Sequence, residues 1–390
     1  MANSTLKTTR RKKGTGSIEK KSNGTYLGKL RVSGYETFYY TGTSEREVQK
    51  KLNEFRISTQ RKEIIPRRQT VNAYIEVWLK TIKKPSMKPA SFDRLERTFE
   101  NQIKNTHVGR SQLGNLTTLE IQMLINSYTQ TLSYSSLKKV YNLLNNCLRY
   151  AVTVRDLSFN PVDGVQLPKK ENLSIATKEI QILSREDLQK LEDAQNATYS
   201  TGRLRFRYAP AYILIANTGL RSGEALALTW DKVNFVSRTI TISQSASRVK
   251  NRDVDGLRQK GSQQITTSTK KQKGIRTIPL NHKALNALNM LKNQQLQEHT
   301  QTNFVIATSS GKMVVQNSFY QIFQKMQKRL GIQPVTVHAL RHTFATNLIK
   351  ANVDIKVVSQ LLGHSSVKIT YDTYVHTDLK RAASAVMALE

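Results

Sequence analysis

The residue types best suited to chemistry on a phosphate begin with Arg221, which directly follows the turn sequence Thr218-Gly219-Leu220. The next residues, Ser222–Leu228, are predicted to form a helix, so the guanidinium lies at a helix start. Backbone amides and the helix dipole favour an anion there, and the arginine adds a planar fork of donors. Glu224 lies three residues later on the same helix face, and we expect it to hold the arginine in place.

A second group of this kind is His338 with Arg341, three residues apart and therefore on one helix face. The imidazole offers a proton-transfer group beside a second guanidinium. His338 and His342 also have the spacing of a zinc-binding helix. Residue 339 is alanine, however, and no metal-site carboxylate follows, so the sequence predicts no metal site.

Two more candidate groups follow near the end of the chain. Asp354 is predicted to cap a helix over Ile355–Leu362, and Gly363 to end it in a left-handed conformation. This arrangement presents His364 just beyond the helix. Tyr374 comes ten residues later, in the sequence Thr-Tyr-Val-His.

In this order the groups resemble those of the tyrosine recombinases, the phage-type integrase family. Its members carry an Arg, a Lys in a hairpin, His-x-x-Arg, Leu-Gly-His and a nucleophilic Tyr. The flanking Thr-Gly-Leu-Arg-Ser-Gly-Glu and Leu-Arg-His-Thr-Phe-Ala sequences match as well. The catalytic resemblance covers residues 180–385. It implies a catalytic set of Arg221, Lys270, His338, Arg341, His364 and Tyr374, supported by Glu224.

The resemblance implies cleavage and rejoining of DNA through a covalent 3′-phosphotyrosine, with no metal, cofactor or ATP. Two arginines would stabilise the charge that develops on the nonbridging oxygens. His338 would assist proton transfer, His364 would hydrogen-bond the phosphate, and a lysine would protonate the departing 5′-oxygen. Tyr371 lies only three residues before Tyr374, but the family's Thr-Tyr-x-His context surrounds Tyr374.

The position of the lysine is open, because Lys270, Lys271 and Lys273 are packed together before Gly274. Counting back from Pro279 by the common family pattern selects Lys270. A shorter hairpin would select Lys271. Lys273 fits better as a solvated or phosphate-positioning charge.

The elements that position these groups predict a multidomain, mainly α protein. Residues 180–390 form the predicted catalytic domain, mostly helical with one small antiparallel sheet. Its strands, Thr239–Ser243 and Ile275–Leu280, flank a long polar excursion over Ala246–Ser268. Its tail, Asp378–Glu390, has near-helical apolar spacing and suits docking on its own domain or on a neighbouring protomer.

Residues 67–168 are predicted to be a helical bundle that resembles a core-binding domain, and residues 169–179 a linker. Apolar spacing predicts four helices. Their expected ranges are Val71–Leu79, ending before Lys83-Lys84-Pro85, then Ser91–Ile103, Thr118–Tyr128 and Ser135–Val152.

Residues 1–66 are predicted to be a small sheet-plus-helix module behind a basic arm, resembling an arm-type DNA-binding domain. Three short strands, Ser17–Lys21, Tyr26–Val32 and Thr37–Tyr40, precede a helix over Glu45–Ile57, and Asn-Gly separates the first two. A sheet can lie in a DNA groove. The predicted DNA contacts are Lys29, Arg31, Tyr26 and Tyr40.

The charge of the chain agrees with an elongated polyanionic partner. Its 390 residues carry 61 Lys and Arg against 28 Asp and Glu, for a net charge of +33, and each predicted domain has an excess of basic residues. The single cysteine, Cys147, and the lack of a long apolar run indicate a reducing compartment. We expect a cytoplasmic bacterial protein on nucleoid or element DNA, with no membrane partner.

The expected function is integration or excision of a mobile element, a phage or a conjugative transposon. The expected partners are double-stranded DNA with core-type and arm-type sites, a homo-tetramer on that DNA, and an accessory DNA-bending or excision protein. Two other functions remain open from sequence. A transcriptional regulator with a helix-turn-helix explains the charge but not the ordered Arg, His and Tyr set, and a type IB topoisomerase does not need the N-terminal module.

Overall fold

The computed structural model of the chain describes residues 16–32, 37–60, 69–175, 181–253, 258–268 and 275–374. It divides into two compact units, Met1–Lys178 and Glu179–Glu390. Within the described residues, the first unit has separate hydrophobic clusters in its sheet module and its helical part. The finer division at residues 66 and 168 stays a prediction. The described helices include none long and apolar enough to cross a membrane.

The N-terminal module is a three-stranded antiparallel sheet covered on one face by a helix. The strands β1 (Ser17–Lys20), β2 (Tyr26–Leu30) and β3 (Phe38–Gly42) lie in that order, and α1 (Glu45–Gln60) follows. Val48 and Leu52 of α1 are fully buried against the sheet. Gly28 permits this close packing, because a Cβ there would lie 2.4 Å from Val48 Cγ1.

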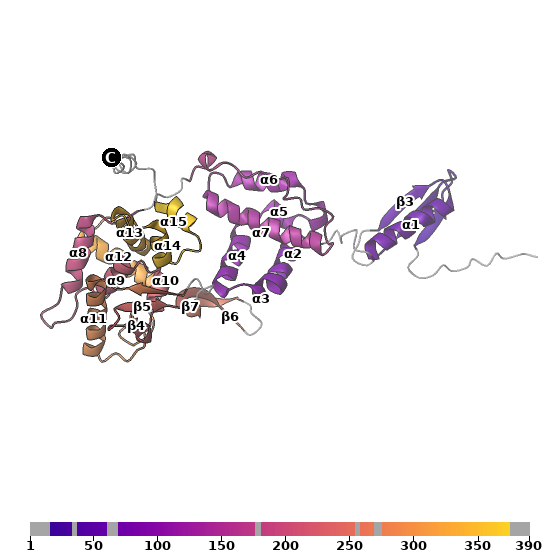
Figure 1. Cartoon of the computed structure of the whole chain (residues 1–390). Coiled ribbons are helices and arrows are strands. Elements are labelled where there is room, and N and C mark those ends of the chain that lie inside the picture. The colour runs from indigo at the N-terminus through magenta and orange to yellow at the C-terminus, as the bar shows by residue number, and fades with distance from the viewer. Residues whose placement is uncertain are drawn as a thin grey trace, which may run out of the picture. The chain divides into compact units, whose positions relative to one another are not determined.

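The helical part of the first unit contains the four expected helices, with ends shifted by a few residues (Figure 1). Their apolar faces form one core that includes the fully buried Cys147. Short helical turns, which the sequence did not predict, join them. The helices are α2 (Val71–Trp78), α3 (Lys84–Ser86), α4 (Pro89–Gln102), α5 (His107–Arg110), α6 (Thr118–Ser127) and α7 (Tyr134–Thr153), with single turns at Leu79–Lys83, Leu113–Asn115 and Lys170–Asn172.

The expected end of the first helix before Lys83-Lys84-Pro85 is wrong. The helix continues through a π-helical turn, Leu79–Lys83, into α3. In this wider turn the Lys84 N–H donates to the Leu79 carbonyl, five residues back. The turn brings the chain to Pro85, which has no N–H to donate, at the start of a new helical segment, where a proline is tolerated.

The second unit is mostly helical around one large core, with two small sheets in its described residues. Helix α9 is buried almost throughout its length, and the Tyr212 hydroxyl donates to the Phe319 carbonyl at 2.8 Å. The helices are α8 (Arg185–Asn196), α9 (Ala209–Thr218), α10 (Ser222–Leu226), α11 (His282–Gln297), α12 (Gln316–Leu330), α13 (Val337–Lys350), α14 (Ile355–Leu362) and α15 (Val367–Tyr374), with a 3₁₀ turn at Trp230–Lys232.

The expected antiparallel strands are present as β5 (Thr239–Ile242) and β8 (Arg276–Pro279), beside β4 (Val233–Asn234). The expectation of a single small sheet is wrong, because the polar excursion forms a second one. There β6 (Gln244–Arg252) pairs with β7 (Arg258–Ser268) in antiparallel register. Both faces of this pair are rich in polar residues, so the sequence lacks the apolar alternation that marks a half-buried strand.

Candidate active site

Arg221 is positioned by a tight turn between two buried helices. Helix α9 ends at Gly219, whose φ of +65° favours glycine, and a Cβ there would lie 2.5 Å from Phe344 Cδ1. Arg221 then caps α10. As the spacing predicted, Glu224 holds the arginine: its carboxylate accepts from the Arg221 backbone N–H at 2.9 Å and from Nη1 at 2.8 Å.

Glu224 also binds a second arginine, which was not predicted as a site residue from the sequence. Arg276, at the start of β8, donates from Nη2 to Glu224 Oε2 at 2.7 Å and from Nη1 to Oε1 at 3.2 Å. Burial opposes the charge of Glu224. The hydrogen bonds and charge of Arg276, together with the charge of Arg221, outweigh it and lower the pKa of Glu224 to about 2. The carboxylate of Glu224 is therefore ionised at neutral pH and pairs with both guanidinium groups.

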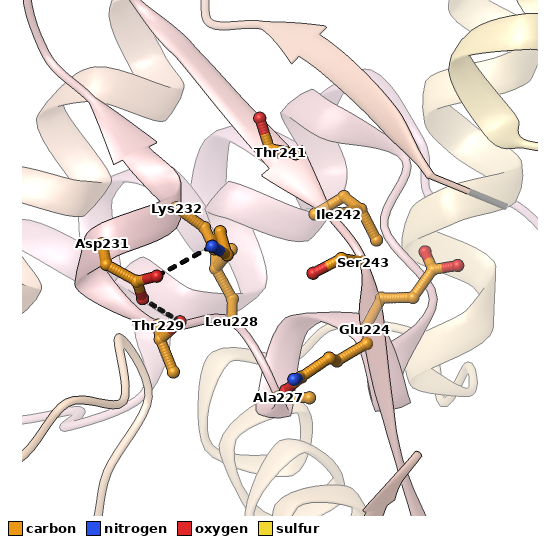
Figure 2. A pocket seen from close by; sticks show the side chains of 10 residues that line it. Glu224, Ala227, Leu228, Thr229, Asp231, Lys232, Thr241, Ile242 and Ser243 are labelled. Atoms are coloured by element: carbon orange, nitrogen blue, oxygen red, sulfur yellow. Dashed lines mark hydrogen bonds and ion pairs between the residues drawn. The ribbon is translucent and has the colours of Figure 1, made fainter. Parts of the chain in front are cut away.

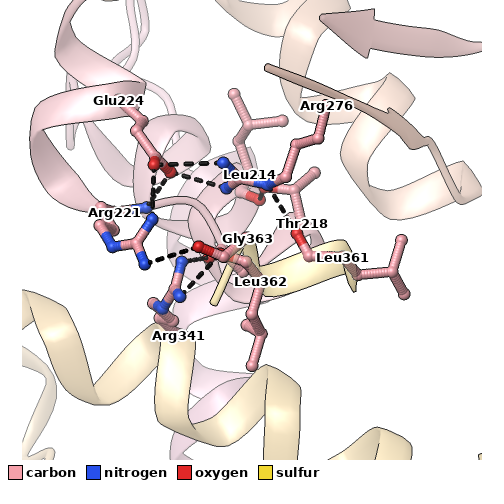
Figure 3. A network of polar contacts seen from close by, with 10 residues as sticks. Leu214, Thr218, Arg221, Glu224, Arg276, Arg341, Leu361, Leu362 and Gly363 are labelled. Atoms are coloured by element: carbon pink, nitrogen blue, oxygen red, sulfur yellow. Dashed lines mark hydrogen bonds and ion pairs between the residues drawn. The ribbon is translucent and has the colours of Figure 1, made fainter. Parts of the chain in front are cut away.

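Three arginines converge on the C-terminal end of α14 (Figure 3). They donate to three consecutive carbonyls, which lie at the negative end of the helix dipole. Arg341 also donates to the Gly219 carbonyl at 2.8 Å, so it ties this helix end to the turn before Arg221. The bonds to α14 are Arg276 Nε to Leu361 at 2.7 Å, Arg341 Nη2 to Leu362 at 2.8 Å and Arg221 Nη2 to Gly363 at 3.1 Å.

Both ends of α14 have the predicted geometry. Asp354 caps its start, accepting from the backbone amides of Lys356 and Val357, and Gly363 ends it at a φ of +65°. A Cβ at Gly363 would also lie 2.9 Å from Arg276 Nη1. Glycine is thus required there by the backbone conformation and by the close approach of an arginine.

Arg341 is the largest of the fully buried side chains, at 1% exposure, whereas the Arg221 side chain is 40% exposed. Burial, and then the positive charge of Arg221, lower the pKa of Arg341 to about 9, so the guanidinium stays charged at neutral pH. One arginine therefore lies within the protein and the other at its surface.

Both candidate histidines are neutral at pH 7. Burial, then the nearby His342 and Arg341, lower the pKa of His338 to about 4. Burial, then the charges of Arg341 and Arg221, lower the pKa of His364 to about 4 as well. His364 Nδ1 lies 2.8 Å from the Thr370 hydroxyl of α15, which orients the ring. Neutral imidazoles can accept as well as donate hydrogen bonds.

Tyr374 reaches this cluster from α15, whereas Tyr371 is 56% exposed on the same helix. The Tyr374 hydroxyl lies 2.7 Å from Nδ1 of His342. Burial raises the pKa of Tyr374, and the charges of Arg341 and Arg221 oppose that increase. The sequence suggested His342 only as a zinc ligand, which residue 339 argues against. Its spacing of four residues from His338 nevertheless places both histidines on one face of α13.

The candidate lysines Lys270, Lys271 and Lys273 lie outside the described residues, as does the tail Asp378–Glu390. The described chain ends at Ser268 in β7 and resumes before Arg276 in β8. The choice between Lys270 and Lys271 stays a prediction.

The four predicted DNA-contacting residues of the N-terminal module divide between two faces of its sheet. Tyr26 and Tyr40 pack on the face covered by α1, and the Tyr40 hydroxyl donates to Glu47 Oε1 at 2.9 Å. Lys29 lies three residues after Tyr26 on β2 and therefore points to the opposite face of the sheet. It is exposed, and its Nζ lies 5.7 Å from the ring centroid of Tyr39. Arg31, just beyond β2, is also exposed.

A cavity of about 270 Å³ lies next to this site and shares Glu224 with it (Figure 2). Its lining comes from the segment after α10 and from the end of β5, and includes Thr229, Lys232 and Ser243. None of the predicted catalytic arginines, histidines or tyrosines is among the lining residues, so the cavity does not contain the reacting groups. Within the described ranges, no cluster of three or more His, Cys, Asp or Glu side chains could hold a metal ion.

Comparison with known proteins identifies the family of the chain. Residues 181–381 match the phage integrase family. A tyrosine recombinase XerC-like protein of Caldanaerobacter subterraneus subsp. tengcongensis is 29% identical over 334 residues, 82% of each chain. The integrase of Staphylococcus phage L54a is 25% identical, over 89% of this chain and 98% of its own.

Solved structures show the same fold. The Tn1549 transposon integrase in complex with transposon right end DNA aligns with a TM-score of 0.67 at 20% identity, over 82% of this chain and 99% of that one. A lambda integrase tetramer bound to a Holliday junction aligns with a TM-score of 0.56 at 17% identity, over 94% and 97% of the two chains.

Proposed function

Because the chain belongs to the phage integrase family and is a tyrosine-type site-specific DNA recombinase, we propose that Arg221, His338, Arg341, His364 and Tyr374 form its active site. Enzymes of this family cleave and rejoin DNA through a covalent 3′-phosphotyrosine. Family membership decides against the two alternatives left open by the sequence, a regulator without catalysis and a type IB topoisomerase.

One observation carries the assignment. Arg221 and Arg341, far apart in the sequence, donate to adjacent carbonyls of the turn that presents His364. Each guanidinium has five N–H groups, so further donors remain for the nonbridging oxygens of a phosphate. Preorganised donors of this kind stabilise charge that develops in the transition state. Glu224 and Arg276 act behind them as positioning residues.

The proposed reaction is an in-line displacement at phosphorus. The Tyr374 oxygen forms a bond to phosphorus, the bond to the 5′-oxygen breaks, and the product is a 3′-phosphotyrosyl strand. As it attacks, Tyr374 gives up its hydroxyl proton with the assistance of His338, and His364 hydrogen-bonds an oxygen of the phosphate. Lys270, or Lys271 if the hairpin is shorter, protonates the departing 5′-oxygen. The covalent link retains the bond energy, so no cofactor is needed.

The test requires a DNA substrate that traps the covalent complex. A pool of nicked duplexes with a randomised segment is incubated with the protein, and covalently bound DNA is recovered and sequenced; the selected sequence is the trap duplex. We expect Tyr374→Phe to bind the trap duplex but to form no adduct on a denaturing gel. The matched variant Tyr371→Phe should still form it. An adduct with Tyr374→Phe overturns the assignment.

We also propose that the N-terminal module binds a separate arm-type DNA site and that residues 67–168 and the catalytic domain bind the core site. The separate hydrophobic cores of the sheet module and the helical part support this division. The exposed face of the sheet, with Lys29 and Tyr39, is the better candidate for DNA contact than the face that holds Tyr26 and Tyr40.

On DNA, a homo-tetramer is proposed, since a lambda integrase of the same fold forms one on a Holliday junction. We propose that the enzyme integrates and excises a mobile element with the help of an accessory DNA-bending or excision protein. Its substrate is DNA, so we propose action in the bacterial cytoplasm, on the nucleoid or the element.

A further inference from the structure

The hydroxyl of Tyr374 is already engaged before any DNA is bound. Its oxygen lies 2.7 Å from Nδ1 of His342, and the two ring centroids are 5.5 Å apart. Both side chains are half-buried. His338, the family's expected proton-transfer group, instead meets the ring of His342 edge-on, with centroids 4.6 Å apart. The histidine in contact with the nucleophile is therefore His342.

The direction of this hydrogen bond follows from the protonation state of the imidazole. Burial, and then the positive charge of Arg341, lower the pKa of His342, so its ring is neutral at pH 7. A neutral ring carries one proton, and a phenol is the more acidic partner. The bond is therefore strongest with the tyrosine O–H donating to Nδ1 and the ring proton on Nε2.

We infer that His342 is a catalytic residue that accepts the proton of Tyr374 as this tyrosine attacks, an inference that rests on the proposed role of Tyr374 as nucleophile. As the bond between the tyrosine oxygen and phosphorus forms, the proton passes from that oxygen to Nδ1 and the ring becomes an imidazolium. The bond from phosphorus to the 5′-oxygen breaks, and a different group protonates that oxygen.

In the rejoining step the transfer runs backwards. The 5′-hydroxyl attacks the phosphotyrosine, the tyrosine oxygen leaves, and the imidazolium returns its proton to it. Burial, and then the charge of Arg341, disfavour an imidazolium here and keep the ring neutral between turnovers. Negative charge developing on the phosphate offsets that repulsion during the reaction. His342 thus exchanges a proton with the nucleophile, and the lysine protonates the leaving group.

The experiment distinguishes loss of the proton acceptor of Tyr374 from loss of the group that protonates the 5′-oxygen. It compares the trap duplex with a version that has a 5′-bridging sulfur, a leaving group that needs no proton. His342→Asn keeps a hydrogen-bond acceptor near the position of Nδ1 but cannot take up a proton. We expect it to bind the trap duplex normally and to cleave more slowly by on the order of 10²-fold. The sulfur duplex should leave that defect in place, while it should rescue the Lys270→Ala or Lys271→Ala variant.

A second variant tests proton acceptance itself. His342→Ala leaves space beside Tyr374, and added imidazole should restore part of the cleavage rate, more so as the pH rises through the pKa of imidazole. His282→Asn, at an exposed histidine of α11, is the matched control and should cleave at the wild-type rate. If His342→Asn does not fold, the imidazole rescue of His342→Ala decides the question.

Four results would overturn the inference: wild-type cleavage by His342→Asn, rescue of its defect by the sulfur duplex, no response of His342→Ala to imidazole, or cleavage by His342→Asn that is faster than wild type. In the last case the hydrogen bond to His342 would restrain Tyr374 instead of activating it. Failure of the proposed function is distinguishable from failure of this inference, because Tyr374→Phe would then still form a covalent adduct with the trap duplex.

Discussion

The proposed active site (Arg221, His338, Arg341, His364 and Tyr374, called the catalytic cluster below) and the N-terminal sheet module both carry basic and aromatic side chains, but they hold them in different ways. In the catalytic cluster, Arg341 is 1% exposed and each arginine contacts a carbonyl or a carboxylate. In the sheet module, Lys29 is exposed and its aromatic neighbour Tyr39 is 57% exposed. Buried donors with fixed partners can act on a transition state, whereas exposed charges supply binding that depends on salt.

The largest effect expected from this contrast is at Arg341. Substitution by lysine leaves one point charge where a fork of donors contacts two carbonyls, those of Gly219 and Leu362. We expect Arg341→Lys to slow cleavage of the trap duplex by about 10³-fold. Arg329→Lys, at an exposed arginine of α12, is the control and should cleave normally. Equal cleavage rates for the two variants would show that the buried Arg341 matters no more to cleavage than an exposed arginine.

Glu224 should give the next largest effect, on stability as well as on rate. Its side chain is 4% exposed and is the counterion of both Arg221 and Arg276. Leaving buried charge uncompensated typically costs about 3–5 kcal/mol. We expect Glu224→Gln to lower the free energy of unfolding by about 3 kcal/mol in urea titrations. Glu54→Gln, in an exposed ion pair of the sheet module, should leave the unfolding curve unchanged.

Acid should weaken the catalytic domain before it affects the sheet module. The pKa values of His338 and His364 are about 4 in the folded protein, below the usual 6.5. Between pH 6.5 and 4 the unfolded chain takes up protons that the folded chain does not, so stability falls as the pH falls through this window.

Urea unfolding at pH 7 and pH 5 measures this loss, and His364→Gln should reduce it. The sheet module precedes His107, the first histidine of the chain, so its unfolding should not change between these pH values. A catalytic domain equally stable at both would contradict the low histidine pKa values.

Much of the catalytic cluster was predictable because short motifs determine local geometry. The caps at Asp354 and Gly363 and the contact of Glu224 with Arg221 follow from sequence spacing alone. The bond between His342 and Tyr374 joins residues on two helices, and the contact of Arg276 with Glu224 joins a strand to a helix. Only the tertiary fold brings such pairs together, and no local pattern predicts them.

The fold shows the same limit. Helices with apolar stripes were predicted to within a few residues, but the β6–β7 hairpin was not, because polar residues occur on both of its faces. In the sheet module, the composition of the strands predicted a DNA-binding surface but not which face is open. The register decides that, and it turns Tyr26 and Tyr40 toward α1.

The smallest catalytic effect should follow removal of the sheet module. We expect deletion of residues 1–66 to leave cleavage of the trap duplex measurable, because no residue of the proposed active site comes from this part. Binding to a separate arm-type duplex, measured by footprinting, should be lost. Binding by the full chain should weaken steeply with salt. Protection of two separated sites by the truncated protein would contradict the division.

Within the sheet module, Lys29→Ala should weaken arm-site binding several-fold and reduce its salt dependence, because an exposed cation on the open face is lost. Tyr40→Phe removes only the hydroxyl that donates to Glu47 and should leave binding unchanged. A larger loss from Tyr40→Phe would place the DNA on the other face.

Identifying the tyrosine that carries DNA tests whether Tyr374 is the nucleophile. The wild-type protein is incubated with the trap duplex, the covalent complex is digested with a protease and a nuclease, and the modified peptide is sequenced by mass spectrometry. We expect a nucleotide remnant on Tyr374. A remnant on Tyr371, or on any other residue, would contradict this expectation.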